Sequence, residues 1–192
     1  MSAHEVQCAY CARKRCFFGD LSQAPDFCPT SNYPEVLASA KTKLDQSENQ
    51  KMAQDVARTW KGGYGKLTRV EETVLYAKLR GYKKLGLAFC VGLSKEAVLM
   101  TNLLLNEGFD VASVCCMCGG LSCDDVNLPQ EDKIELPVGT LKAMAETSAD
   151  VELALSTRQP MCNPIGQAAI LEAEGCEFNI LFGLCVGDDT LF

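Results

Sequence analysis

Residues 85–116 read LGLAFCVGLSKEAVLMTNLLLNEGFDVASVCC, and this stretch decides the fold of the chain. The apolar runs at 85–91 and 111–116 have the length and the glycine-bounded ends of buried strands. Between them, apolar residues at helical spacing predict an amphipathic helix that begins with Ser94 as its N-cap and continues to about Glu107. The stretch therefore predicts a β-α-β unit with parallel strands and a right-handed crossover.

Two further elements extend this unit toward the C-terminus. Asn163 and Pro164 fit the cap and the first turn of a helix that runs to Glu174. The apolar run 178–184 fits another buried strand, and one more helix is expected near 140–149, within an acidic interval. The predicted fold class is α/β, with a small parallel, Rossmann-like sheet and flanking helices.

The part of the chain before the sheet has a different character. Residues 1–33 contain four cysteines and little apolar periodicity, so metal would have to hold this piece together. Apolar residues at helical spacing follow from Pro34 to about Gly81. We therefore expect a cysteine-rich metal-binding module at 1–33, a helical segment at 34–84, and an α/β domain with strand-end cysteines at 85–192.

Composition and charge narrow the classes of function. The 192 residues include 18 Lys and Arg against 25 Asp and Glu, a formal net charge of −7, and this acidic balance disfavours binding to nucleic acid. No apolar run approaches the roughly 18 residues of a membrane span, and the first residues lack the apolar core of a secretory signal. We expect a cytoplasmic protein that binds neither nucleic acid nor a membrane.

Cysteine is the outlier of the composition, with 12 residues against a single histidine, His4. A reducing cytosol does not sustain disulfides, and a chain of this length does not need them for stability. Because only His4 offers an imidazole, a metal held by several side chains would rely mainly on thiolates. Such ligands favour zinc, iron–sulfur clusters or Cu(I).

The first group of cysteines follows the pattern Cys8-x2-Cys11-x4-Cys16-x11-Cys28-Pro29. The close pair can chelate one centre, and the other two thiolates arrive from a compact loop. Zinc ribbons use two separated Cys-x2-Cys pairs, whereas a single close pair with a last cysteine followed by proline favours a 4Fe–4S cluster. Zinc remains the alternative at this site.

The second group appears once the strands are assigned. Its members follow a predicted strand or begin a predicted helix: Cys90, Cys116, Cys162 and Cys185. The carboxyl ends of parallel strands share one edge, where ligands bind and helix N-termini stabilise thiolates. Cys118 or Cys123 could substitute for Cys116, and we expect Cys115 and Cys176 to be ordinary core residues.

Motifs along nearly the whole chain resemble one family. They are Cys8-Ala-Tyr-Cys11 with Cys16 and Cys28-Pro29, Phe89-Cys-Val-Gly-Leu93, Cys116-x-x-Gly-Gly120, Cys162-Asn-Pro-Ile165 with Gln167-Ala168, and Gly183-Leu-Cys-Val-Gly187 with Asp189 and Leu191-Phe192. The chain resembles a cysteine-rich family of anaerobic bacteria and archaea that is described as metal-binding and catalogued as a domain of unknown function. The resemblance implies a metal-binding α/β protein with its ligands at Cys8, Cys11, Cys16, Cys28, Cys90, Cys116, Cys162 and Cys185.

The chain departs from this family's pattern in two places. Asp188 stands where a histidine is expected after Val186 and Gly187, and the chain ends at Phe192, where we expect similar proteins to continue into another strand. Any role of that histidine or that strand is therefore open.

These observations favour a protein with two thiolate-bound iron–sulfur centres that acts in electron transfer or reductive chemistry in an anaerobe. A redox partner protein or a small-molecule ligand would approach the centre at the sheet edge. The alternative is a zinc-binding structural or sensor protein, or one that handles metal without catalysis. Thiol–disulfide chemistry at Cys115, Cys116, Cys118 and Cys123 ranks third, because their spacings are not Cys-x-x-Cys.

Other chemistry has little support in the sequence. No glycine-rich dinucleotide motif follows the run at 85–91, and no Walker-type motif occurs. The only histidine, at position 4, cannot activate Cys162 as in a papain-like site. The acidic pairs at 124–125 and 188–189 are interpreted as loop or cap residues. The sequence thus identifies no catalytic residue.

Overall fold

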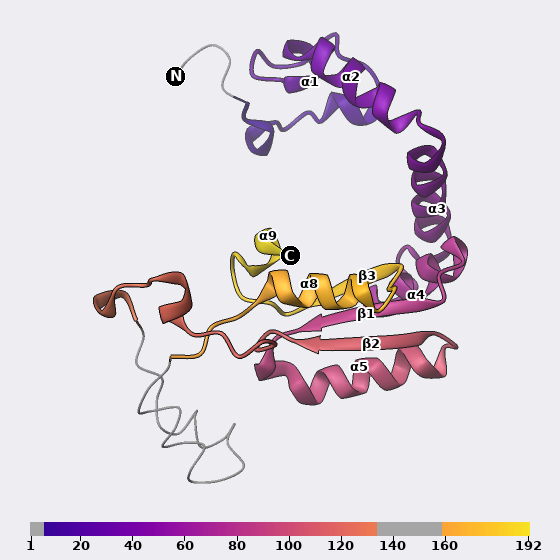
Figure 1. Ribbon diagram of the computed structural model, residues 1–192. Coiled ribbons are helices and arrows are strands. Elements are labelled where there is room, and N and C mark those ends of the chain that lie inside the picture. Colours follow the sequence, from indigo (N-terminus) through magenta and orange to yellow (C-terminus); the bar gives the residue numbers. More distant parts are fainter. Residues whose placement is uncertain (1–5, 134–158) are drawn as a thin grey trace, which may run out of the picture. The chain divides into compact units, whose positions relative to one another are not determined.

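The computed structural model describes residues 6–133 and 159–192, and the chain divides into two compact units, Met1–Glu72 and Thr73–Phe192 (Figure 1). In the described ranges, no helix combines the length and the apolar character that crossing a bilayer requires.

The first unit consists of short turns followed by helices. Two 3₁₀ turns, Cys8–Tyr10 and Arg15–Phe18, precede the short helix α1. The helices are α1 (Pro29–Asn32), α2 (Pro34–Leu44) and α3 (Ser47–Gly63), and α4 (Arg69–Arg80) begins in this unit and ends in the next. Proline occupies the first turn of α1 and α2, where a backbone N–H would have no acceptor within the helix, so its absence costs no hydrogen bond. The predicted helical segment is therefore helical, in three pieces.

The second unit contains the whole described sheet, and it begins at Thr73, twelve residues before the predicted start of the α/β domain at residue 85. Its strands are β1 (Lys84–Phe89), β2 (Asp110–Cys115) and β3 (Phe178–Phe182), and its helices are α5 (Ser94–Asn106), α8 (Pro164–Ala173) and the short α9 (Asp188–Leu191). All pairings are parallel, in the order β2-β1-β3. The α/β fold class is confirmed. The helix predicted near 140–149 lies outside the described residues.

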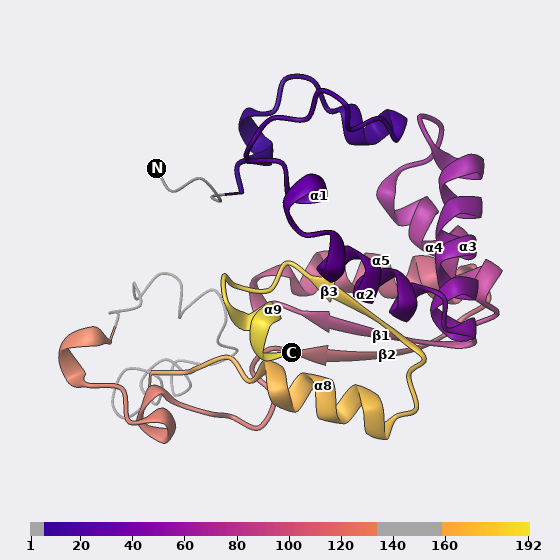
Figure 2. The same cartoon turned by 90° about the horizontal axis from the view of Figure 1, so that it is seen from above.

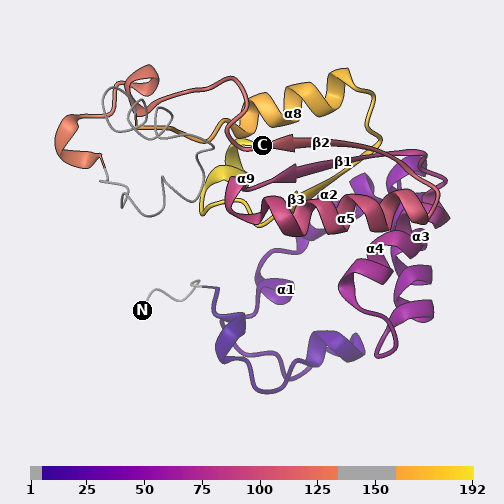
Figure 3. The same ribbon diagram turned by 90° about the horizontal axis from the view of Figure 1, so that it is seen from below.

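The core lies around β1, the central strand. Leu85, Leu87 and Ala88 of β1 are fully buried, as are Leu104 of α5 and Leu171 of α8. The two helices cover opposite faces of the sheet (Figures 1 and 3). A strand buried on both faces explains why the sequence here is continuously apolar.

The start of α5 differs by one position from the prediction. Leu93 takes the N-cap position and Ser94 is the first helical residue. The 3₁₀ turn Val91–Leu93 runs directly into the helix, and the Ser94 hydroxyl donates a hydrogen bond of 2.6 Å to the carbonyl of Val91. Ser94 therefore closes this turn and is not the helix cap.

A buried amide joins α8 to the carboxyl ends of two strands. The side chain of Gln167 is fully buried, and its Nε2 donates to the carbonyls of Val114, at 2.7 Å, and Phe89, at 3.3 Å. Buried carbonyls need such partners. Gln167 thus fixes the start of α8 at the edge where the predicted site lies.

Candidate metal centres

The N-terminal cysteines lie around one cavity. Its volume is about 120 Å³, and its walls include all four predicted ligands: Cys8, Cys11, Cys16 and Cys28. Cys28 is buried, Cys11 is half-buried, and the other two are exposed. Pro25 and Phe27 supply apolar walls. The structure thus brings together the four thiols that the sequence grouped by spacing.

A lysine secures the loop that carries the close cysteine pair. Lys14 Nζ donates to the carbonyls of Cys8, at 2.8 Å, and Cys11, at 2.5 Å. The backbone N–H of Cys11 donates to the Cys8 carbonyl at 3.1 Å, which closes a tight turn. Lys14 has a φ of 45°, in the left-handed region that favours glycine. The ammonium of Lys14 thus ties together the carbonyls of both cysteines from a residue whose own backbone is left-handed.

The last cysteine of the group has an altered acidity. Cys28 immediately precedes α1, and the backbone N–H of Ser31 hydrogen-bonds to its sulfur. This bond, with a smaller one from Thr30, lowers the pKa of Cys28 below its ordinary value, because an N–H donor stabilises the thiolate. Cys28 is therefore predisposed to bind as the anion.

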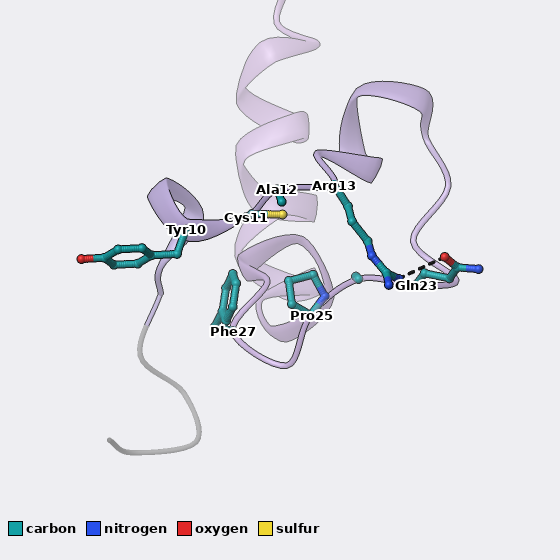
Figure 4. Close-up of a pocket in the computed structure, with 8 residues that line it drawn as sticks. Tyr10, Cys11, Ala12, Arg13, Gln23, Pro25 and Phe27 are labelled. Carbon is teal, nitrogen blue, oxygen red and sulfur yellow. Dashed lines mark hydrogen bonds between the residues drawn. The ribbon is translucent and has the colours of Figure 1, made fainter.

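A second, wider hollow adjoins this cavity. It measures about 520 Å³ and shares Cys11, Ala24, Pro25 and Phe27 with the cavity's walls. Figure 4 shows Phe27 and Pro25 below Cys11, the ring of Tyr10 pointing away from them, and Arg13 on the other side, where its Nη1 donates to Gln23 Oε1 at 3.1 Å. A group that occupied the hollow would lie against the wall that holds Cys11.

The spacing of the sulfurs separates two kinds of centre. A tetrahedral zinc ion with Zn–S bonds of about 2.3 Å places its sulfurs about 3.8 Å apart. Among the described residues, three ligand atoms within 4.8 Å of one another occur at Cys162, Cys185 and Asp188, and no three of the N-terminal sulfurs meet that limit. The N-terminal thiols surround a cavity at wider spacing, whereas the sheet edge has the spacing of a single ion.

The four predicted strand-end cysteines form a connected group. Cys116 is hydrogen-bonded to Cys162, Cys162 to Cys185, and Cys185 to Cys90. The arrowheads of β1 and β2 and the short α9 lie at the same end of the sheet (Figure 2). The carboxyl ends of the parallel strands thus converge as the strand assignment predicted.

Backbone bonds fix the positions of these thiols. The N–H of Cys90 donates to the Phe182 carbonyl at 3.2 Å, and that of Asn163 to the Cys116 carbonyl at 2.7 Å. The Asn163 side chain caps α8 by accepting from Gly166 at 2.9 Å, as predicted from sequence. Cys90, Cys116 and Cys162 therefore lie directly beside β1, β2 and the capped start of α8, whereas Cys185 lies in the turn between β3 and α9.

Burial controls the acidity of Cys116, Cys162 and Cys185. It raises the pKa of Cys116, which is 1% exposed, from 9.0 to about 11, and the N–H of Val91, 3.3 Å from its sulfur, opposes part of this shift. Burial is also the main reason that the pKa values of Cys162 and Cys185 are raised. Without a metal, these thiols hold their protons at neutral pH.

Asp188 joins this group, which the sequence interpretation missed. The Cys162 thiol is hydrogen-bonded to the Asp188 carboxylate. Within the described structure, Asp188 Oδ2 is buried without a hydrogen-bond partner. The signal was present as Cys185-x2-Asp188, a ligand pair at the same spacing as Cys8-x2-Cys11. Lys14 and Gln167 were missed because their roles depend on backbone geometry.

The remaining cysteines lie outside this connected group. The Cys118 thiol is 3.6 Å from the carbonyl of Asn163, to which it donates, and the N–H of Cys123 donates to the Gln159 carbonyl at 3.0 Å. Cys115 ends β2 and Cys176 precedes β3. All twelve cysteines are free thiols. Cys116, and not Cys118, is hydrogen-bonded to Cys162.

The chain matches the model of a family described as a protein of unknown function (DUF1847), over residues 28–146 and 139–192. It is also 33% identical over 187 residues to an uncharacterised protein of Methanocaldococcus jannaschii, covering 97% of this chain and 80% of that protein. No solved structure matches the chain. The match with the family model begins at the fourth N-terminal cysteine and includes every sheet-edge cysteine.

Proposed function

The chain belongs to the DUF1847 family, and from this membership and the geometry of its two cysteine groups we propose that it is an iron–sulfur protein of electron transfer or reductive chemistry. One centre is a 4Fe–4S cluster held by Cys8, Cys11, Cys16 and Cys28. The other is a thiolate-bound metal at the sheet edge. The predicted cytoplasmic location and anaerobic host belong to this proposal, because reducing conditions preserve free thiols.

The observation that carries the proposal is the N-terminal cavity. Four thiols surround a space of about 120 Å³, and no three of their sulfurs come as close as 4.8 Å. A single zinc ion would draw them together, whereas a cluster binds each thiolate to a different iron and so needs wider spacing. The donor set therefore fits a cluster better than one ion.

The residues around this cavity fit a centre that exchanges electrons. A bound 4Fe–4S cluster supplies one-electron redox chemistry. Lys14 holds the carbonyls of Cys8 and Cys11 and places a positive charge beside a group of anionic ligands. Cys8 and Cys16 are exposed. A redox partner can thus approach the ligands, and the hollow beside Cys11 is the place where we expect it to bind.

The tight group at the sheet edge favours a second candidate function, a zinc protein. Cys162, Cys185 and Asp188 have the spacing of a single ion, and zinc accepts both sulfur and carboxylate ligands. In this alternative, zinc also occupies the N-terminal module, and the chain is a structural, sensor or metal-handling protein. It would be colourless and would lose its N-terminal fold to chelators.

Visible spectroscopy on the full chain, purified without oxygen, distinguishes these functions. We expect broad visible absorption that bleaches when dithionite reduces the cluster. The Cys11→Ser variant should lose this absorption, while the matched variant Cys176→Ser, outside both cysteine groups, should keep it. A colourless protein that contains zinc would contradict the iron–sulfur proposal and support the alternative.

A further inference from the structure

Asp188 occupies the position that the second cysteine holds in the N-terminal pair. In the N-terminal turn, the N–H of Cys11 donates to the carbonyl of Cys8 at 3.1 Å. In the C-terminal turn, the N–H of Asp188 donates to the carbonyl of Cys185 at 3.0 Å. The two turns therefore present side chains at positions i and i+3 through the same hydrogen bond.

Glycine makes the second turn feasible. Gly187 has a φ of 96°, which residues with a side chain rarely adopt. This conformation brings the Asp188 carboxylate back toward the Cys185 sulfur, and the Cys162 sulfur arrives from the start of α8. The three ligand atoms lie within 4.8 Å of one another.

One oxygen of the Asp188 carboxylate is also available to coordinate a metal ion. Asp188 Oδ2 is buried and, within the described structure, has no hydrogen-bond partner. A buried carboxylate oxygen without a donor is unfavourable, and a metal ion would supply the missing interaction. The orphaned oxygen is therefore a second observation that points to a ligand at this place.

We propose that Asp188 is a metal ligand, and that together with Cys162 and Cys185 it binds a single divalent ion, either Zn²⁺ or Fe²⁺. This inference rests on the proposed function only in requiring a metal at the sheet edge. It assigns two sulfurs and one oxygen to that ion. Cys116 and Cys90, which are hydrogen-bonded to Cys162 and Cys185, support the ligating sulfurs.

Three protein ligands leave a fourth tetrahedral position free for an external ligand. Sites with three protein ligands and an open position are typical of catalytic metal ions, and closed sites of structural ones. Cys185 is exposed, so solvent reaches this side of the centre. The ligand class that fits is a small anion or neutral molecule that binds through oxygen or nitrogen.

Cobalt(II) provides the test, because its visible bands report tetrahedral geometry and its near-ultraviolet charge-transfer band grows with the number of thiolates. The full chain, with its N-terminal cluster in place so that those four thiols are not free to bind cobalt, is titrated anaerobically with Co²⁺ as wild type, Asp188→Ala and Asp188→Cys. Each spectrum is read as the difference from the cobalt-free protein. Asp189→Ala, which changes the neighbouring exposed carboxylate, is the matched control. Azide then serves as the external ligand.

We expect wild type to bind one Co²⁺ in a tetrahedral site with two thiolates. Asp188→Ala should weaken this binding by at least about tenfold. Asp188→Cys should retain it with the charge-transfer intensity of three thiolates, about 1.5 times that of wild type. Asp189→Ala should behave as wild type, and azide should shift the visible bands in a saturable way.

Unchanged affinity and spectrum in Asp188→Ala would overturn the proposal while leaving a metal at the sheet edge. A wild-type spectrum with four thiolates, or one that azide does not change, would likewise exclude this ligand set. If wild type bound no Co²⁺ at the sheet edge, both this inference and the second centre of the proposed function would fail. The N-terminal cluster, measured by its own visible absorption, would be unaffected.

Discussion

The N-terminal and sheet-edge cysteine groups use the same side chain in opposite environments. Cys28 receives backbone N–H bonds that lower its pKa, whereas burial raises the pKa values of Cys116, Cys162 and Cys185. The first group surrounds a cavity and the second contains a tight trio. Spacing and acidity, rather than the number of cysteines, therefore distinguish the two proposed sites.

The two groups also differ in the secondary structure that carries their cysteines. The N-terminal thiols are carried by short 3₁₀ turns and the start of α1, with few apolar contacts of their own. The sheet-edge thiols lie at the ends of strands that pair in one parallel sheet around the buried β1, and at the capped start of α8. We therefore expect the first site to depend on its metal for folding, and the second to exist before its metal binds.

The largest expected effect comes from removing the close pair. Cys8→Ser with Cys11→Ser should abolish iron and sulfide binding by the first unit and unfold the turns around its cavity, because metal is what stabilises them. The second unit should keep its fold and its metal. Metal analysis and amide hydrogen exchange would measure both. Loss of protection in the second unit would show that the two sites are not independent.

Gln167 tests whether the sheet edge is preformed. Gln167→Leu keeps the volume but removes the amide donor to the carbonyls of Val114 and Phe89, although the Phe89 carbonyl keeps a second donor, the N–H of Cys116. The unfolding free energy should therefore fall by about 1–3 kcal/mol. Chemical denaturation of the metal-free protein checks this value, with the exposed Gln130→Leu as control. Equal stability of both variants would refute the bracing role of Gln167.

Lys14 tests how the first site is held. Lys14→Met removes the donor to the carbonyls of Cys8 and Cys11, and we expect metal to leave the N-terminal site about tenfold faster. Lys14→Gly relieves the positive φ but also removes the ammonium, so it should lose metal too. Release to a chelator is the measurement, with the helical Lys51→Met as control. If Lys14→Gly released metal at the wild-type rate, the backbone conformation at position 14, and not the ammonium, would hold the site.

The smallest effect is a pH dependence, and its sign differs between the two sites. Burial raises the pKa of Cys116 from 9.0 to about 11, so the folded metal-free protein holds a proton that the unfolded chain has lost. This contribution is complete below pH 9 and disappears as the pH rises toward 11. The lowered pKa of Cys28 has the opposite sign, because its contribution is present at high pH and is lost as the pH falls.

Denaturation of the metal-free second unit across this range measures the effect. Wild type should lose stability as the pH rises from 9 to 11, and Cys116→Ala should show a flatter profile. A profile unchanged by the substitution would mean that another group titrates. Metal affinity at the sheet edge should rise with pH over the same range, because the ion must displace these protons.

Much of the fold and part of each site could be predicted from the sequence. Apolar runs located all three strands, although only β1 is buried as predicted and the edge strands β2 and β3 are partly exposed. Asn163-Pro164 marked the start of α8. Parallel strands then placed Cys90, Cys116 and Cys185 at one edge. Hydropathy and spacing suffice for these features, because they reflect periodic burial.

Asp188, Lys14 and Gln167 required the structure. The role of Asp188 depends on a glycine at a φ of 96°, and that of Lys14 on its own left-handed backbone. Gln167 acts through carbonyls that are far away in sequence. Such roles come from three-dimensional hydrogen bonding, which a pattern of residue types does not encode.

Iron, acid-labile sulfide and zinc, counted per chain in protein purified without oxygen, test the central claim most directly. We expect about four irons with matching sulfide for the N-terminal cluster, and one further ion, iron or zinc, without sulfide at the sheet edge. Zinc alone, with no sulfide, would contradict the distinction between a cluster site and a single-ion site.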